Sequence, residues 1–283
     1  MTNDEIKKLK ITANSIRKDI IHMGPRSGNV VHLGGPLGCT DILTILYFKF
    51  LNIKPENPKW EERDRFILSK GHSYTAYYAV LAHRGFFDRE ELWTARSINS
   101  RLQGHPDMNK TPGVDFTSGS LGNGFSIALG MAIGLKYLKN PAKVVVIIGD
   151  GETQEGIVWE AAMSAPLRKV DNLIGILDYN HYQSSGSVDE ILPLEPLAEK
   201  WQAFGWNVLE MDGHDFVDIN KKLKIAFAGG TGKPTMILAN TIKGKGVSFM
   251  ENNNTWHSKL CPPKEYHLAI EELDGQLKVL EKM

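Results

Sequence analysis

The chain of 283 residues carries 33 basic and 33 acidic side chains, so its formal net charge is zero. This balance excludes a strong overall field that would attract nucleic acid or an anionic membrane. The two cysteines, Cys39 and Cys261, are too few and too far apart for a disulfide framework or a zinc site. Because no stretch has the apolar length of a signal peptide or a membrane helix, we expect a soluble, cytoplasmic protein.

The first half of the chain predicts helices joined by glycine-rich connections. Apolar residues recur at helical intervals, Thr40 or Asp41 is the expected cap of the second helix, and Gly85 is expected to end the third. We expect helices at residues 4–23, 39–51, 73–85 and 120–138, with a short strand at 65–69 and a loop over 101–119.

The helix expected over residues 120–138 is rich in glycine, with Gly122, Gly124, Gly130 and Gly134. Glycine lowers helix propensity, so a neighbouring helix or a ligand is expected to approach this helix closely. We expect helix packing to account for Gly130 and Gly134.

The second half alternates apolar strands with helices. Runs that are apolar on both faces predict a parallel sheet covered on both sides, hence a three-layer αβα fold, in which ligands bind at the carboxyl ends of the strands. The strands are expected at residues 143–149, 172–178, 206–212 and 234–241, and the helices at about 153–165, 195–204 and 215–228.

Two polar residues follow neighbouring strands of this sheet. Asp150 comes after the first strand and Asn180 after the second, one crossover apart, so the two side chains should meet. Oxygen ligands without Cys or His suit Mg²⁺ or Ca²⁺ held partly by a phosphate, and Gly149 and Gly151 let the backbone approach it. Alternatively, Asp150 caps the following helix and Asn180 forms a turn. These residues alone leave both interpretations open.

A longer pattern favours the metal. Gly-Asp-Gly, then 28 residues, then an Asn preceded by the apolar "NLIGILD", resembles the thiamine diphosphate-binding motif. The segments "DRFILSKGH", "LQGHPD", "TSGSLGNGFSIALGMA", "LEPLAEKWQAFGWNVLEMDGHD" and "TIKGKGV" resemble, in order, the diphosphate-binding half of a transketolase. This resemblance covers nearly the whole chain. It implies a single thiamine diphosphate-binding domain over residues 1–283, with a short C-terminal extension from about residue 248.

The resemblance also implies the cofactor ligands. Asp150, Asn180 and the backbone carbonyl of Tyr182 would bind Mg²⁺, for which Ca²⁺ or Mn²⁺ could substitute, and Gly151 would lie against the diphosphate of thiamine diphosphate. The resemblance further assigns residues to the cofactor's aminopyrimidine side and to an interface between chains. The former are Gly119, Ser120 and Leu121, and the latter is Glu155.

Four histidines match family positions with catalytic roles. His72 and His257 would line the diphosphate and thiazolium side of the site, whereas His32 and His105 would contact the oxygens of the donor sugar and shuttle protons. Histidine suits this work because its pKa lies near neutrality.

Two segments depart from the family pattern. The metal loop reads "DYNHYQSSG", with Tyr179, His181 and Gln183 where most members have other residues, and "GNVVHLGG" replaces the common Ser-Gly-His-Pro-Gly form. The first departure puts the contacts around the metal and the accepted substrate in doubt. A specialised ketose, including a branched or sulfonated one, is compatible with it.

The resemblance implies transfer of a two-carbon ketol unit from a ketose, usually a phosphate as in the pentose phosphate pathway, to an aldose. In transketolases, a Glu from a second, pyrimidine-binding domain activates the cofactor. We therefore expect a partner chain with that C-terminal domain and an α₂β₂ heterotetramer. One alternative is the E1 alpha subunit of a 2-oxoacid dehydrogenase, a decarboxylase. The other is a non-catalytic paralogue that still binds the cofactor.

Overall fold

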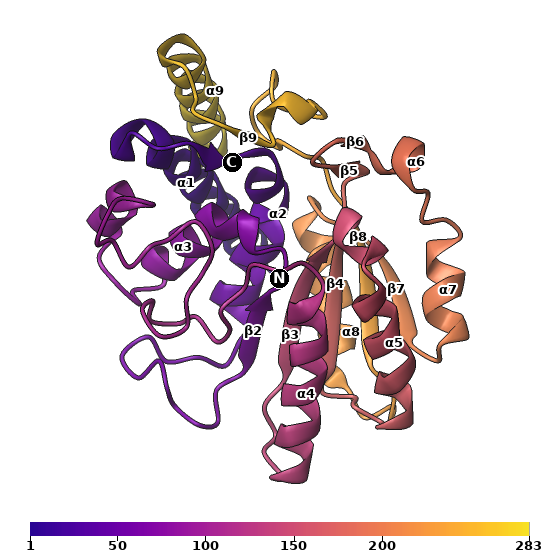
Figure 1. Cartoon of the computed structure of the whole chain (residues 1–283). Helices are drawn as coiled ribbons and strands as arrows, with labels where there is room; N and C mark the ends of the chain where they lie inside the picture. The colour runs from indigo at the N-terminus through magenta and orange to yellow at the C-terminus, as the bar shows by residue number, and fades with distance from the viewer. Residues whose placement is uncertain (283) are drawn as a thin grey trace.

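The computed structural model describes residues 1–282, which are built around a five-stranded sheet (Figure 1). The strand order is β2-β3-β4-β8-β7, and each neighbouring pair is parallel. The predicted parallel sheet is therefore confirmed. Its strands are β2 (Arg65–Leu68), β3 (Val144–Gly149), β4 (Leu173–Tyr179), β7 (Asn207–Asp212) and β8 (Thr235–Asn240).

Helices cover both faces of this sheet, as the buried pattern of β3 and β4 requires. Successive residues of β3 face different cores: Val145 packs with the layer of α1, α2, α3 and α8, and Val146 packs with that of α4, α5 and α7. Figure 1 shows α4 and α5 in front of the sheet and α8 behind it. The helices are α1 (Asn3–Ser27), α2 (Gly34–Ile45), α3 (Tyr74–His83), α4 (Asn123–Tyr137), α5 (Gly156–Leu167), α7 (Leu197–Ala203) and α8 (Phe216–Ala228).

The remaining elements are short, except for the C-terminal helix α9. The chain after residue 248, expected to be an extension, packs onto the rest: β9 pairs with β1, and Lys18 of α1 forms an ion pair with Asp274 of α9. No helix within residues 1–282 is long and apolar enough to cross a membrane. The remaining elements are β1 (Val31–His32), η1 (Leu46–Phe50), η2 (Gly71–Ser73), η3 (Arg89–Thr94), η4 (Gly151–Gln154), β5 (Tyr182–Gln183), β6 (Gly186–Ser187), α6 (Val188–Ile191), η5 (Asn254–Trp256), β9 (Ser258–Lys259) and α9 (Pro263–Lys282).

The predicted start of the second helix is wrong. Helix α2 begins at Gly34, so Thr40 and Asp41 lie buried inside it and cap nothing. Pro36 falls in the first turn, where the missing N–H of proline costs no hydrogen bond. The Thr40 hydroxyl instead donates to the Pro36 carbonyl at 2.9 Å.

Close packing of α4 occurs at two of its four expected glycines, Gly122 and Gly124. A Cβ added at Gly130 or Gly134 would meet no atom within 4 Å, so our expectation for these two residues is not met within the described chain. The close approach occurs at the start of the helix. A Cβ at Gly124 would lie 2.8 Å from Cα of Ser69, and one at Gly122 would lie 2.6 Å from Cγ2 of Ile157.

These contrasting environments give a matched pair of variants on one helix. Gly124→Ala should lower the free energy of unfolding by about 1–3 kcal/mol, because the Ser69 backbone cannot move without disturbing β2. Gly130→Ala should leave it unchanged or raise it by up to about 1 kcal/mol, because alanine restricts the unfolded chain and meets open space. Urea unfolding of both variants measures the difference, and equal effects would contradict this account of the glycines.

Candidate functional site

The carboxyl ends of four strands meet around one cavity of about 320 Å³. Because Gly149 of β3 is in register with Asp178 of β4, and Tyr179 with Asn240 of β8, the residues that follow these strands must lie close together. Eight residues predicted from the sequence line this cavity. They are His72, Leu121, Asp150, Gly151, Glu155, Asn180, Tyr182 and His257.

Asp150 and Asn180 meet as the crossover between their strands predicts. The Asp150 carboxylate accepts hydrogen bonds from the backbone N–H of Asn180 at 3.1 Å and from that of Gly151 at 2.7 Å. The Asn180 side-chain oxygen accepts from the backbone N–H of Tyr182 at 3.1 Å. Asp150 also precedes the short helix η4, so the metal and capping interpretations describe compatible roles of one residue.

The environment of Asp150 suits a cation. Burial, together with the neighbouring Asp178 carboxylate, raises the pKa of Asp150 to about 7. A divalent cation would offset both effects, and carboxylate and amide oxygens are ligands that Mg²⁺ accepts. Within residues 1–282, no group of three or more His, Cys, Asp or Glu side chains could hold a metal. A metal at Asp150 would therefore depend on amide, backbone or phosphate oxygens.

A second buried carboxylate shapes the turn after β3. Glu152 accepts hydrogen bonds from the Ser69 hydroxyl, from the backbone N–H of Gly122 at 2.8 Å and from that of Gly149 at 3.0 Å. It therefore connects the ends of β2 and β3 to the start of α4. Sequence reasoning assigned Glu152 no role, although its place beside Gly-Asp-Gly was a signal.

Two buried lysines at the cavity were also missed. Lys70 forms an ion pair with Asp178, and both side chains are almost fully buried. The Nζ of Lys243 lies 2.5 Å from Oδ1 of Asn254 and 3.1 Å from Nδ1 of His257. Burial lowers the pKa of Lys243 to about 8. Both lysines stand inside quoted motifs, "SKGH" and "TIKGKGV", but no local pattern indicated that they reach the cavity.

Three of the predicted histidines form one cluster. The ring centroids of His32, His72 and His257 lie 5.3 to 5.4 Å apart in all three pairs. Burial lowers the pKa of His32 and His257 to about 4 and that of His72 well below its ordinary value. The cluster is therefore neutral at pH 7, with each ring able to accept one proton.

The other predicted residues lie beside the cavity. A Cβ on Gly71 would lie 3.2 Å from Cδ2 of His105, which places His105 next to the turn that carries His72. His105, Gly119 and Ser120 are exposed and do not line the cavity. Their roles stay predictions, as does the metal-binding role of the Tyr182 carbonyl.

The unusual loop after β4 is held by its own unusual residues. The Tyr179 hydroxyl donates to Glu195 at 2.7 Å, and its ring lies 4.1 Å from that of His181. A Cβ on Gly151 would lie 2.6 Å from Cβ of Gln183, so the loop packs directly on the glycine turn. Of the unusual residues, Gln183 lines the cavity, as does Asn180, whereas Tyr179 and His181 do not.

The cavity combines a carboxylate, an amide oxygen and buried ammonium groups, a donor set that fits a divalent cation bound to a diphosphate. Neither His32 nor Ser118 lines this cavity, but within residues 1–282 the buried His32 Nδ1 and Ser118 Oγ have no hydrogen-bond partner. A profile of the family "Transketolase, thiamine diphosphate binding domain" matches residues 12–266. The chain belongs to this transketolase family.

Individual transketolases extend the comparison. The chain is 46% identical over 268 residues to the 6-deoxy-6-sulfo-D-fructose transketolase subunit SqwG of Clostridium sp. (strain MSTE9), covering 95% of this chain and 97% of that one. It is 38% identical to an apulose-4-phosphate transketolase subunit of Phocaeicola vulgatus, covering 98% of each. The Campylobacter jejuni transketolase structure superposes with a TM-score of 0.83 at 31% identity, over 97% of this chain but 48% of that one. The chain thus spans about half of that solved transketolase.

The histidine cluster predicts an acid-sensitive stability. Between pH 6.5, the ordinary pKa, and about pH 4, the unfolded chain binds protons at His32 and His257 that the folded chain does not, so stability falls as the pH falls. The double variant His32→Asn, His257→Asn should show a shallower fall in Tm from pH 7 to 4.5 than the wild type. His267→Asn, at an exposed position of α9, is the control. Parallel curves for all three proteins would contradict this prediction.

Proposed function

We propose that this chain is the thiamine diphosphate-binding subunit of a two-chain transketolase. The single observation that carries the proposal is the convergence of Asp150, Asn180 and Lys243 at one cavity, in a chain of the transketolase family. Two relatives of nearly equal length are themselves called transketolase subunits, which supports a separate partner chain. A cytoplasmic location stays a prediction.

Named residues of this chain would hold the cofactor. Asp150, Asn180 and the carbonyl of Tyr182 would bind Mg²⁺, with Ca²⁺ or Mn²⁺ as substitutes, and the Lys243 ammonium would balance diphosphate charge. Gly151, whose Cα packs against Gln183, lines the cavity beside Asp150 and would lie against the diphosphate. Leu121 lies on the cavity wall, and the neighbouring Gly119 and Ser120 would contact the aminopyrimidine side.

When bound, thiamine diphosphate supplies the nucleophilic carbon that carries the two-carbon ketol unit. The chain's own contribution is to orient the reactants and move protons. His32, His72 and His257 lie together as neutral rings, each with one N–H donor and one nitrogen acceptor, so they would hydrogen-bond the sugar hydroxyls and pass protons between them. His105, exposed beside the Gly71 turn, would reach the outer part of the substrate.

The partner would be the C-terminal, pyrimidine-binding subunit, in an α₂β₂ heterotetramer. It would contribute the carboxylate that activates the cofactor, and Glu155, exposed at the edge of the cavity, is positioned to face it. The donor would be a ketose, usually a phosphate as in the pentose phosphate pathway, and the acceptor an aldose. The names of the relatives make sulfonated and branched ketoses the first donors to screen.

Cofactor binding should depend on the Asp150 carboxylate. Asp150→Asn should weaken Mg²⁺-dependent binding of thiamine diphosphate by at least about a hundredfold, because changes to outer-shell groups alone cost metal sites about 10–100-fold. Isothermal titration with and without Mg²⁺ measures this. Asp189→Asn, an exposed Asp of α6, is the matched control and should bind as the wild type does. Undiminished binding by Asp150→Asn would contradict the proposed metal-binding role of Asp150.

The activity should require both chains. The reconstituted pair, with thiamine diphosphate and Mg²⁺, should transfer a ketol unit from a ketose to an aldose, and this chain alone should not. Full ketol transfer by this chain alone would contradict the two-chain proposal. Decarboxylation of a 2-oxoacid would support an E1 alpha subunit, and cofactor binding without any turnover would support a non-catalytic paralogue.

A further inference from the structure

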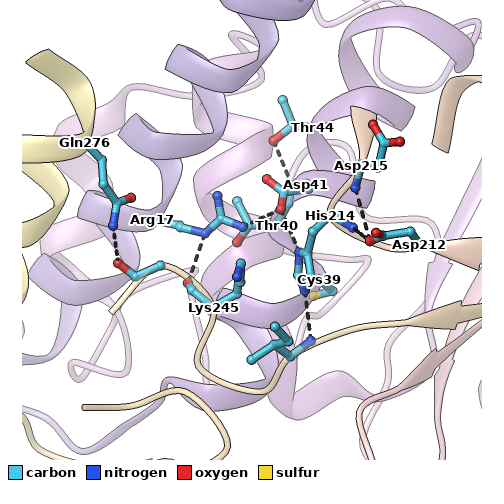
Figure 2. Close-up of polar contacts among 12 residues, drawn as sticks. Arg17, Cys39, Thr40, Asp41, Thr44, Asp212, His214, Asp215, Lys245 and Gln276 are labelled. Atoms are coloured by element: carbon cyan, nitrogen blue, oxygen red, sulfur yellow. Dashed lines mark hydrogen bonds and ion pairs between the residues drawn. The ribbon is translucent and has the colours of Figure 1, made fainter. Parts of the chain in front are cut away.

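A buried polar chain lies behind the segment that carries Lys243. Arg17 of α1 donates from Nη2 to Oδ2 of Asp41 on α2 at 2.6 Å. The same Asp41 oxygen lies 2.9 Å from Nδ1 of His214, which follows β7. Figure 2 shows these three side chains joined in a row by dashed lines. None of them lines the proposed cofactor cavity.

The chain ends on the backbone beside Lys243. The N–H of Ile242 donates to Nε2 of His214 at 2.8 Å. A backbone N–H can only donate, so Nε2 must be the unprotonated nitrogen, and the ring proton lies on Nδ1 and points to Asp41. His214 is therefore held as one neutral tautomer between a carboxylate and a peptide group.

Arg17 also contacts the segment directly. Its Nε donates to the Lys245 carbonyl at 3.1 Å (Figure 2), and a Cβ on Gly246 would lie 2.8 Å from its Cδ. The side chains of Arg17 and Asp41 are only 9% and 5% exposed. Solvent therefore screens this ion pair weakly, and loss of one partner would leave a buried charge unpaired.

One face of α2 is shaped to receive the segment. Gly34, Gly38 and Asp41 are spaced four and three residues apart, so they share a helix face. The Gly244 N–H donates to the Gly34 carbonyl at 2.8 Å, and a Cβ on Gly38 would lie 3.0 Å from the Ile242 carbonyl oxygen. The two glycines allow the backbone of residues 242–244 to approach α2 closely. Asp41, on the same helix face, orients His214.

We propose that Arg17, Asp41 and His214 are positioning residues that fix the Ile242 and Lys243 peptide and thereby set the place of the Lys243 ammonium in the cofactor site. The proposal rests on the proposed function only in assigning the cofactor's diphosphate to Lys243. His214 contacts Ile242, the chain neighbour of the cavity residue Lys243, and does not itself line the cavity. Its effect reaches the site through the main chain.

Two substitutions at His214 separate its two hydrogen bonds. His214→Gln places an amide oxygen near the position of Nε2, so it can still accept from Ile242. His214→Asn reaches only the position of Nδ1, so it retains a partner for Asp41 and loses Ile242. We expect His214→Asn in the reconstituted enzyme to bind thiamine diphosphate and Mg²⁺ about tenfold more weakly, the effect of one lost hydrogen bond, and His214→Gln to bind nearly as the wild type. Equal losses in both variants would overturn the proposal.

A measurement without cofactor tests the same contact in the full chain. Hydrogen exchange of the Ile242 amide should accelerate in His214→Asn and stay close to wild type in His214→Gln. Unchanged protection in His214→Asn would overturn the proposal even if the wild type bound no thiamine diphosphate. Failure of the wild type to bind the cofactor would instead contradict the proposed function, so the two failures are distinguishable.

A double-mutant cycle tests whether the effect acts through Lys243. In a Lys243→Met background, His214→Asn should weaken cofactor binding by much less than in the wild type. Additive losses would show that His214 acts through the general fold and would overturn the positioning role.

Arg17→Lys retains a cation near Asp41 but lacks the Nε donor to Lys245. Arg17→Lys is the second variant if His214→Asn does not fold. We expect Arg17→Lys to lose less affinity for the cofactor than His214→Asn would. Unchanged affinity in Arg17→Lys would overturn the proposal.

Discussion

The ion pair of Lys70 and Asp178 is the constraint on which the rest of the site depends. Both side chains are almost fully buried, and Asp178 also accepts hydrogen bonds from the Thr241 hydroxyl and from the Asn180 amide at 3.1 Å. One carboxylate thus ties together the ends of β2, β4 and β8. Removing either charge would leave the other uncompensated in the interior, which is strongly destabilising. The fold therefore specifies the relative positions of Lys70, Asn180 and the Lys243 segment together.

The cavity has two regions of different chemistry. Asp150, Asn180 and the buried lysines form a charged region where a metal and phosphate groups would be compensated. His72 and His257 line a neutral region, together with the adjacent His32, which does not itself line the cavity, because burial keeps these rings unprotonated. Lys243 stands at the boundary, in contact with His257. Burial lowers the pKa values on both sides, so a bound anion would stabilise the charged form of Lys243, whereas the histidines remain neutral hydrogen-bonding groups.

Much of the fold and part of the site could be predicted from sequence, for identifiable physical reasons. Apolar runs predicted β3, β4 and β8, because strands buried on both faces have no polar alternation. The edge strand β7 was also predicted, although most of its residues are only half-buried or exposed. One crossover predicted the meeting of Asp150 and Asn180. The start of α2 was missed because Gly-Gly-Pro is typical of a turn, yet here it forms a first helical turn. The expectation for Gly130 and Gly134 is not met within the described chain, because a glycine in a helix lowers helix propensity whether or not another group approaches it.

The contacts that hold the segment around Lys243 could not be predicted because their partners are remote in sequence. Arg17 contacts the Lys245 carbonyl across 228 residues, and His214 contacts Asp41 across 173. Local periodicity carries no information about such pairs. Gln276 of α9 adds a third contact, donating to the Gly246 carbonyl at 2.9 Å. Helices α1 and α9, from opposite ends of the described chain, thus both hold the segment that carries Lys243.

This arrangement has a kinetic consequence. Contacts of large sequence separation close long loops, whose entropic cost must be met before the contacts form, so they tend to form late in folding. The parallel sheet can align Asp150 with Asn180 through one local crossover, whereas Lys243 reaches its place only after α1, α2 and α9 have assembled around its segment. The Asp150 side of the pocket should therefore form early and the Lys243 side last, which makes the complete pocket a marker of the fully folded chain.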